Sequence, residues 1–312
     1  MRETRISASD RATLTSRAAM ASIAMALILV GLKLWAALQT SSMAMLGSLA
    51  DSGLDLIASI VVLVGVRVAA QPADYEHRFG HGKAEALASL VQVILITLSA
   101  LFIAFRAIQR LLAGAVTERA ELGIGVSIVA MGLTILLIAY QRHIVRRTGS
   151  LAISTDRLHY SSDLLLNGSV ILALALDQFA GLAGADALFG LLIALWLGWG
   201  ALRASAQSIN QLMDREWPEQ DRQDFLAACQ DYPELAGLHD FRTRTSGNHQ
   251  FVQFHVWVPG DWTVQQAHDR IDRVELELQK RFPGTEILIH LDPEGHTDRE
   301  TMLPSDITEQ AT

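Results

Sequence analysis

The sequence is poor in cysteine and in charged residues, and each shortage excludes a class of protein. Its single cysteine, Cys229, excludes a disulfide framework, a cysteine-rich zinc finger and an iron–sulfur cluster. Only 19% of the 312 residues are charged and 50% are hydrophobic, whereas about 25% charged residues are usual in a soluble chain. This balance indicates a membrane protein that also contains a soluble portion.

The charges are distributed unevenly along the chain. Residues 1–212 carry 16 Lys and Arg against 13 Asp and Glu, whereas residues 213–312 carry 9 against 20, a net charge of −11. An acidic C-terminal portion of this kind disfavours nucleic acid as a partner and tolerates cations.

Two catalytic motifs are also absent. The His-Glu-x-x-His motif of a metalloprotease does not occur. Lys83 does not belong to a phosphate-binding loop, because His77 stands where that loop needs glycine and Ala84 where it needs Ser or Thr. We therefore do not expect this protein to be an enzyme.

Six apolar stretches are long enough to cross a bilayer, which takes about 20 helical residues. They predict an all-helical transmembrane domain in residues 16–212, preceded by a cytoplasmic segment of residues 1–15. The predicted spans are Ser16–Leu38, Met45–Ala69, Ala86–Ile108, Leu122–Tyr140, Leu151–Leu176 and Ala185–Ser205.

Lysine and arginine favour alternate ends of these spans. The N-terminal segment and the loops after the second and fourth spans contain Lys or Arg, whereas the loops after the first and fifth contain none. The positive-inside rule then places both termini in the cytoplasm. Three arginines near the third loop oppose this assignment: Arg106, Arg110 and Arg119.

The residues after Asp214 predict a small soluble α+β domain, residues 213–296. Their order, helix–strand–strand–helix–strand, is typical of an open sandwich of ferredoxin-like type. Residues 297–312 are expected to be disordered. The predicted elements are helices Pro218–Tyr232 and Thr263–Phe282 and strands Ala236–Thr245, His249–Val258 and Glu286–Leu291.

Two of the predicted spans contain side chains that are costly inside a membrane. The second span holds Asp51 and Asp55, and the fifth holds His159 and Asp163. Each pair is spaced i,i+4, so its side chains project from one helix face. A carboxylate at the bilayer centre costs about 2.5–3.5 kcal/mol on insertion scales, so we expect a cation to compensate it. Three oxygens and one nitrogen suit tetrahedral Zn²⁺, and Asn167 on the same face could donate to a ligand.

Two further groups of histidines could bind metal. The loop after the second span holds one, and two or three imidazoles meeting a carboxylate would form a closed site in the C-terminal domain. The alternatives are hydrogen bonding within the bundle for the intramembrane pairs and ordinary solvated side chains for these two groups. The loop group is Asp74, His77 and His81, and the C-terminal group is His239, His255, His268, His290 and Asp292.

These motifs together resemble those of the cation diffusion facilitator family. The resemblance rests on Asp-x-x-x-Asp, His-x-x-x-Asp, a Gln-Pro-Ala-Asp…His-Arg-Phe-Gly-His-Gly-Lys-Ala-Glu loop and a His-Asp-x-Arg-Thr-Arg-x-Ser-Gly strand, and it extends from Ser16 to about Pro293. It implies a homodimer of the bacterial inner membrane, with six transmembrane helices and a cytoplasmic metallochaperone-like domain. It also implies exchange of a cytoplasmic divalent metal for protons.

The resemblance further implies roles for individual residues. Lys83 and Asp214 would form a charge interlock at the dimer interface, and Leu158 would be an apolar gate. The implied metal sites are a transport site of Asp51, Asp55, His159 and Asp163, a loop site of Asp74, His77 and His81, and a binuclear interface site of His239, His255, His268, His290 and Asp292, the last bridging.

We therefore expect a divalent metal/proton antiporter that works by alternating access, with Zn²⁺ as its cargo and as a regulatory ion of the C-terminal domain. Metal ligands must be deprotonated to bind, so one site holds either metal or protons. A histidine ligand favours Zn²⁺ and Cd²⁺ over Mn²⁺ and leaves Fe²⁺ and Co²⁺ open. The alternatives are a passive metal channel and a membrane-anchored metal sensor.

Overall fold

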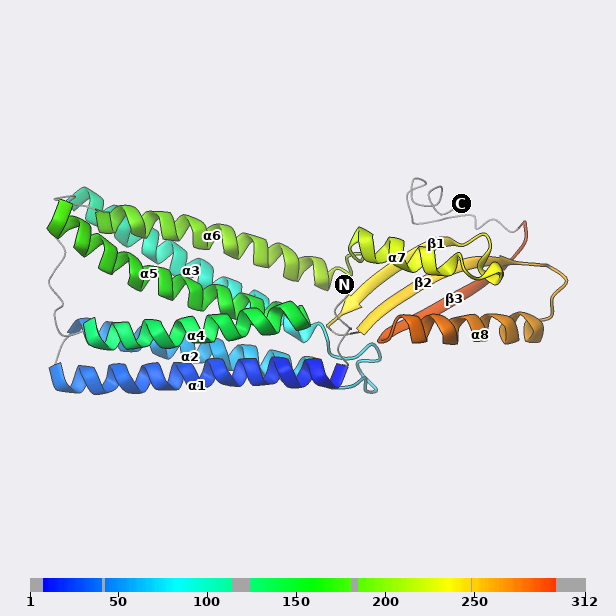
Figure 1. The fold of residues 1–312 in the computed structure, drawn as a ribbon, viewed down its shortest axis with the longest axis horizontal. Helices are drawn as coiled ribbons and strands as arrows, with labels where there is room; N and C mark the ends of the chain where they lie inside the picture. Colours follow the sequence, from blue (N-terminus) through cyan, green and yellow to red (C-terminus); the bar gives the residue numbers. More distant parts are fainter. Residues whose placement is uncertain (1–7, 41–42, 114–123, 181–184, 248, 296–312) are drawn as a thin grey trace. The chain divides into compact units, whose positions relative to one another are not determined.

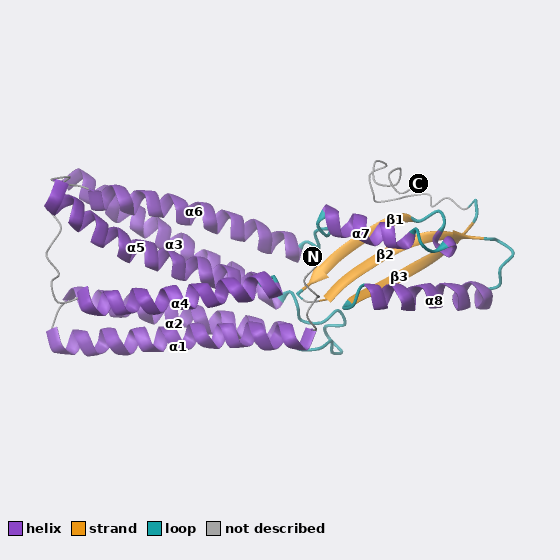
Figure 2. Cartoon of the chain, viewed as in Figure 1, coloured by secondary structure: helices purple, strands orange, loops and turns teal. Residues whose placement is uncertain are grey.

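The computed structural model describes residues 8–40, 43–113, 124–180, 185–247 and 249–295. The chain divides into two units, between Ile209 and Asn210. The first, called the helical unit, consists of long helices, and the second, called the C-terminal unit, combines helices with a sheet (Figures 1 and 2). The predicted fold class is therefore confirmed, whereas the predicted tail, residues 297–312, lies outside the described residues.

The helical unit contains six long helices, one for each predicted span. Five predicted spans lie inside their helices, and the fourth begins at Leu122, outside the described residues. Helices run past the apolar stretches because backbone hydrogen bonding continues into the flanking polar residues. The helices are α1 (Ala8–Thr40), α2 (Met43–Ala69), α3 (Ala84–Ala113), α4 (Ile124–Thr148), α5 (Leu151–Ala180) and α6 (Ala185–Leu212).

Five of these helices contain, within the described residues, segments long and apolar enough to cross a membrane. Many large apolar side chains on them are exposed, including Leu101 and Leu202, as expected for surfaces that face lipid. Helix α5 is equally long, but its N-terminal half is more polar and contains Asp156, His159 and Asp163. It packs against α2, α3 and α4.

Helices α2 and α3 approach closely because small residues meet between them. A Cβ atom at Gly65 of α2 would overlap the Cβ of Ala88 on α3. Small residues at such crossings let helix backbones pack closely in membranes. This contact holds α2, which carries the predicted ligands Asp51 and Asp55, against its neighbour.

The C-terminal unit has a three-stranded sheet in the order β1-β2-β3. Strands β1 (His239–Ser246) and β2 (His249–Val258) are antiparallel, and β3 (Thr285–Pro293) is parallel to β2. A parallel neighbour needs a crossover connection, which α8 (Val264–Arg281) supplies after a capping box of Thr263 and Gln266. The remaining elements are α7 (Glu219–Cys229) and a short 3₁₀ helix, η1 (Pro233–Leu235), which was not predicted.

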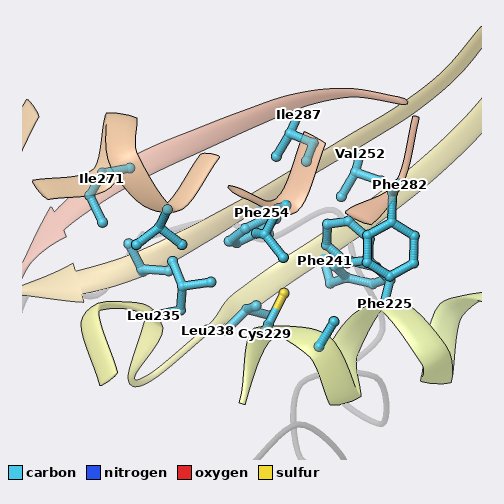
Figure 3. Packing of buried hydrophobic residues seen from close by; sticks show 14 of the residues in the cluster. Phe225, Cys229, Leu235, Leu238, Phe241, Val252, Phe254, Ile271, Phe282 and Ile287 are labelled. Atoms are coloured by element: carbon cyan, nitrogen blue, oxygen red, sulfur yellow. The ribbon is translucent and has the colours of Figure 1, made fainter. Parts of the chain in front are cut away.

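The core of this unit lies between the two helices and one face of the sheet (Figure 3). Phe225 of α7 and Ile271 of α8 pack there with Phe254 of β2. The predicted apolar stripe of α8 is buried except for Val264 in its first turn, which is 87% exposed. Both helices cover one face, so the histidines of the opposite face are left uncovered in the single chain.

Replacing Phe225 by alanine is expected to lower the free energy of unfolding of the C-terminal unit by about 3–5 kcal/mol. The ring is fully buried and contacts the rings of Phe241, Phe254 and Phe282. Hydrogen exchange of the β2 amides in the full chain would measure the loss as faster exchange. The control Val264→Ala should leave exchange unchanged, and equal protection in both variants would contradict a central role for Phe225.

Candidate metal centres

The closest contact between the two predicted ligand pairs joins α2 to α5. His159 Nε2 lies 2.8 Å from Asp55 Oδ1 and 3.8 Å from Asp163 Oδ2. The side chains of His159 and Asp55 are only 10% and 14% exposed. Ligand atoms of Asp55, His159 and Asp163 all lie within 4.8 Å of one another, close enough to share one ion.

The other residues predicted at or near this site do not belong to this group of three. Asp51 is exposed and does not belong to the group of three. The Asn167 amide donates to the backbone oxygen of Asp163, at 2.9 Å, and not to a ligand atom. Leu158 packs in a small apolar cluster with Ile96 of α3 and Leu197 of α6.

A buried carboxylate that the sequence analysis missed lies one turn before His159. Asp156 is fully buried and accepts hydrogen bonds from Ser22 of α1, Gln92 of α3 and Gln141 of α4. The sequence alone could have indicated it, because Asp156 is a further charged residue of the fifth predicted span, three positions before His159.

An intramembrane cation was also missed. Lys33 of α1 is partly buried, and its Nζ donates to Ser52 Oγ at 2.7 Å. Ser52 is next to Asp51 in the sequence and is fully buried. A positive charge therefore lies beside the acidic segment of α2, where it offsets negative charge in a medium of low dielectric.

The loop group Asp74, His77 and His81 is brought together, but at the surface. His77 Nδ1 and His81 Nε2 each lie 3.3 Å from an Asp74 oxygen. The backbone N–H of His77 donates to Asp74 Oδ1, which chiefly lowers the pKa of Asp74, and the N–H of Glu76 adds to the effect. Since the His81 ring also contacts the Pro72 carbonyl oxygen at 3.2 Å, the loop is held folded around this carboxylate.

In the C-terminal unit three histidines surround one carboxylate on the uncovered face of the sheet. The Asp292 oxygens lie 2.9 Å from His255 Nδ1, 3.3 Å from His239 Nε2 and 3.4 Å from His290 Nε2. Burial alone would raise the pKa of Asp292, but the hydrogen bond from His255 and the neighbouring imidazoles lower it overall. The strand register explains the cluster, because His239, His255 and His290 are paired across the three strands.

A β-bulge in β1 brings His239 into this row. The register shifts between His239 and Arg242, and Asp240 within the bulge has φ of 50°. Bulges re-aim side chains next to functional sites. Simple alternation along the strand would not have predicted this pairing.

Within the described residues, His268 lies outside the group of His239, His255 and Asp292. His268 is exposed on α8, on the helix-covered side of the sheet. Asp214 lies 3.9 Å from Arg244 of its own unit, whereas Lys83 belongs to the helical unit. The bridging role of Asp292, the part of His268 and the Lys83–Asp214 interlock therefore stay predictions.

The lowered pKa of Asp292 has a consequence for acid stability. A carboxylate with a folded pKa below its ordinary value of 3.8 stabilises the fold above that value, and this contribution is lost as the pH falls through the folded pKa. In metal-free buffer we expect Asp292→Asn to destabilise the C-terminal unit at about pH 5 and much less at about pH 3.

Hydrogen exchange of the β2 amides in urea would measure this difference at both pH values. The control Asp261→Asn changes an exposed carboxylate in the turn before α8 and should behave like the unsubstituted chain. A loss of stability in Asp292→Asn that is larger at the lower pH than at the higher one would contradict a lowered pKa of Asp292.

Two family models and several related proteins match nearly the whole chain. Residues 19–213 match the family model described as the cation efflux transmembrane domain, and residues 217–294 match that of the cation efflux protein, cytoplasmic domain. The cation-efflux pump FieF of Escherichia fergusonii is 43% identical over 287 residues, which cover 92% of this chain and 95% of the relative. The FieF of Salmonella typhimurium is 42% identical with the same coverage.

One solved structure is similar to about a quarter of the chain. It is the metal-bound C-terminal domain of the CzcD transporter from Thermotoga maritima, which is 28% identical and covers 26% of this chain and 95% of that one, with a TM-score of 0.24. The family models and the FieF relatives together show that this chain is a multi-pass membrane protein that exports metal cations and belongs to the cation efflux family, also called the cation diffusion facilitators.

Proposed function

We propose that this protein exports Zn²⁺ from the cytoplasm in exchange for protons, through a transport site of Asp51, Asp55, His159 and Asp163. The observation that carries the proposal is the 2.8 Å contact of His159 with Asp55, which joins α5 to α2 inside an apolar bundle. One nitrogen and several carboxylate oxygens are donors that suit Zn²⁺, and they also admit Cd²⁺ and Fe²⁺.

The same contact supports coupling to protons. The His159 Nε2–H donates to the Asp55 carboxylate, and a metal needs that nitrogen without its proton. Metal binding to a doubly protonated His159 imidazole, or to a protonated ligand carboxylate, would release a proton, and protonation of the site would release the metal. Opening of the site to one side of the membrane at a time would convert this competition into antiport.

We infer from the charge pattern that both termini are cytoplasmic, because Lys and Arg are concentrated in the N-terminal segment and the loops after α2 and α4. We infer that the membrane is the bacterial inner membrane from the similarity to the FieF pumps of Escherichia fergusonii and Salmonella typhimurium. The loop group of Asp74, His77 and His81 would then face the cytoplasm and could bind metal there.

Substitution of a transport ligand should nearly abolish uptake of zinc into proteoliposomes. Asp55→Ala and His159→Ala are each expected to reduce the uptake by at least about 10- to 100-fold, the range found when only a supporting group of a metal ligand is lost. A pH-sensitive dye in the lumen would record proton movement in the opposite direction.

A matched control is Ser169→Ala, which removes a hydroxyl of α5 that donates within its own helix to Leu166. This variant should transport normally. Undiminished zinc uptake by Asp55→Ala would contradict the proposed transport site. Zinc flux without proton counterflow would favour a passive channel. A membrane-anchored sensor would instead take up no zinc in any variant.

We further infer that the protein is a homodimer and that zinc bound at the C-terminal histidines stabilises it. The cluster of His239, His255 and Asp292 offers two imidazoles and a carboxylate on an uncovered sheet face, and a metal there would neutralise part of the acidic charge of this unit. A ligand that binds only the associated form shifts the equilibrium toward it.

Zinc should therefore raise the dimer fraction of the full chain in detergent, measured by sedimentation. His255→Ala should remove most of this response, because His255 provides the shortest contact to Asp292. His249→Ala, which changes an exposed histidine of the same strand, should retain it. A zinc response that is equal in both variants would exclude the cluster as the regulatory site.

A further inference from the structure

The carboxylate of Asp156 is held by donors on three different helices. Its Oδ2 accepts from Ser22 Oγ at 2.6 Å and from Gln141 Nε2 at 2.7 Å, and its Oδ1 accepts from Gln92 Nε2 at 2.8 Å. All four side chains are fully buried. The three bonds tie α5 to α1, α3 and α4 at one level of the bundle.

Neighbouring residues of α5 extend these ties. Tyr160 shares a hydrogen bond of 3.0 Å with Ser59 of α2 and donates to the backbone oxygen of Ser22. Thr155 shares a hydrogen bond of 2.7 Å with Ser89 of α3. Residues 155–160 of α5 are thus hydrogen-bonded to α1, α2, α3 and α4, and Asp156 makes more of these bonds than the other two.

A buried carboxylate is a costly way to join helices. It must be compensated by donors in a medium of low dielectric, and apolar side chains could fill the same space. Hydrogen bonds are directional, however, whereas apolar contact is not. The carboxylate therefore fixes the rotation of α5. The Gln92 amide donates to it, and the Gln141 amide donates both to it and to Ser22 Oγ, at 3.0 Å. The Oε1 atoms of both glutamines have no partner among the described residues.

The rotation of α5 determines where His159 presents its nitrogen. Three residues advance a helix by about 300° and 4.5 Å, so Asp156 and His159 are about 60° apart on adjacent turns. A rotation of about 10° would move an atom about 6 Å from the helix axis by about 1 Å. Metal–ligand distances tolerate only about 0.2 Å, so small rotations would spoil the site.

We propose that Asp156 is a positioning residue of the transport site, which holds α5 at the rotation that brings His159 within reach of Asp55. The inference rests on the transport function proposed above. Asp156 binds no metal itself, and it acts through its hydrogen bonds to Ser22, Gln92 and Gln141.

The test is the zinc dependence of uptake into proteoliposomes by the full chain. Asp156→Ala should raise the KM for zinc by about 10- to 100-fold, as expected when a group that orients metal ligands is lost, with a smaller effect on the maximal rate. Asp156→Asn should restore a KM close to that of the unsubstituted chain. Its amide can accept from Ser22 and donate to the unpartnered Oε1 of Gln92 or Gln141 after that side chain turns.

Two further variants control for folding. Thr134→Val removes a buried hydroxyl of α4 that donates only within its own helix and should leave the KM unchanged. If Asp156→Ala does not fold, Gln141→Leu removes one of the two donors to Oδ2 and should give a smaller rise in KM.

Each result has a distinct meaning. An unchanged KM in Asp156→Ala, or in Gln141→Leu where that variant replaces it, overturns the positioning role. Equal impairment in Asp156→Asn and Asp156→Ala also overturns it, since the charge rather than the hydrogen bonds would then matter. If the unsubstituted chain takes up no more zinc than Asp55→Ala, the transport site itself is wrong and the positioning role falls with it.

Discussion

The hydrogen bond between His159 and Asp55 connects α5 to α2 inside the helical unit. Both side chains are largely buried, at 10% and 14% exposed, so each needs a hydrogen-bond partner within the protein. His159 and Asp55 satisfy each other, at 2.8 Å. A metal would compete for the same nitrogen and oxygen, so its binding would have to replace this hydrogen bond.

The same chemistry, carboxylate beside imidazole, recurs in three environments. It is buried between helices at Asp55, exposed in the loop at Asp74, and set on a sheet face at Asp292. The Asp74 side chain is 51% exposed, whereas those of Asp55 and His159 are 14% and 10% exposed. In the function proposed above, these differences in burial would let one pair of residue types serve capture, transport and regulation.

The network around Asp156 shows why α5 differs from the other long helices. Its N-terminal half is polar, and it is bonded on several sides to other helices of the bundle. A helix that must present ligands at fixed positions needs directional contacts. The close approach of α2 and α3 instead depends on small residues such as Gly65.

The sequence by itself determined the six helices, the α+β unit and most of the clustered ligands, because apolar length and residue spacing are local properties. Only the tertiary structure decided that Asp156 meets Gln92 and Gln141, which lie 64 and 15 residues before it in the chain. The bulge at Asp240 likewise depends on strand pairing. Such contacts arise from how elements pack, and no local pattern encodes them.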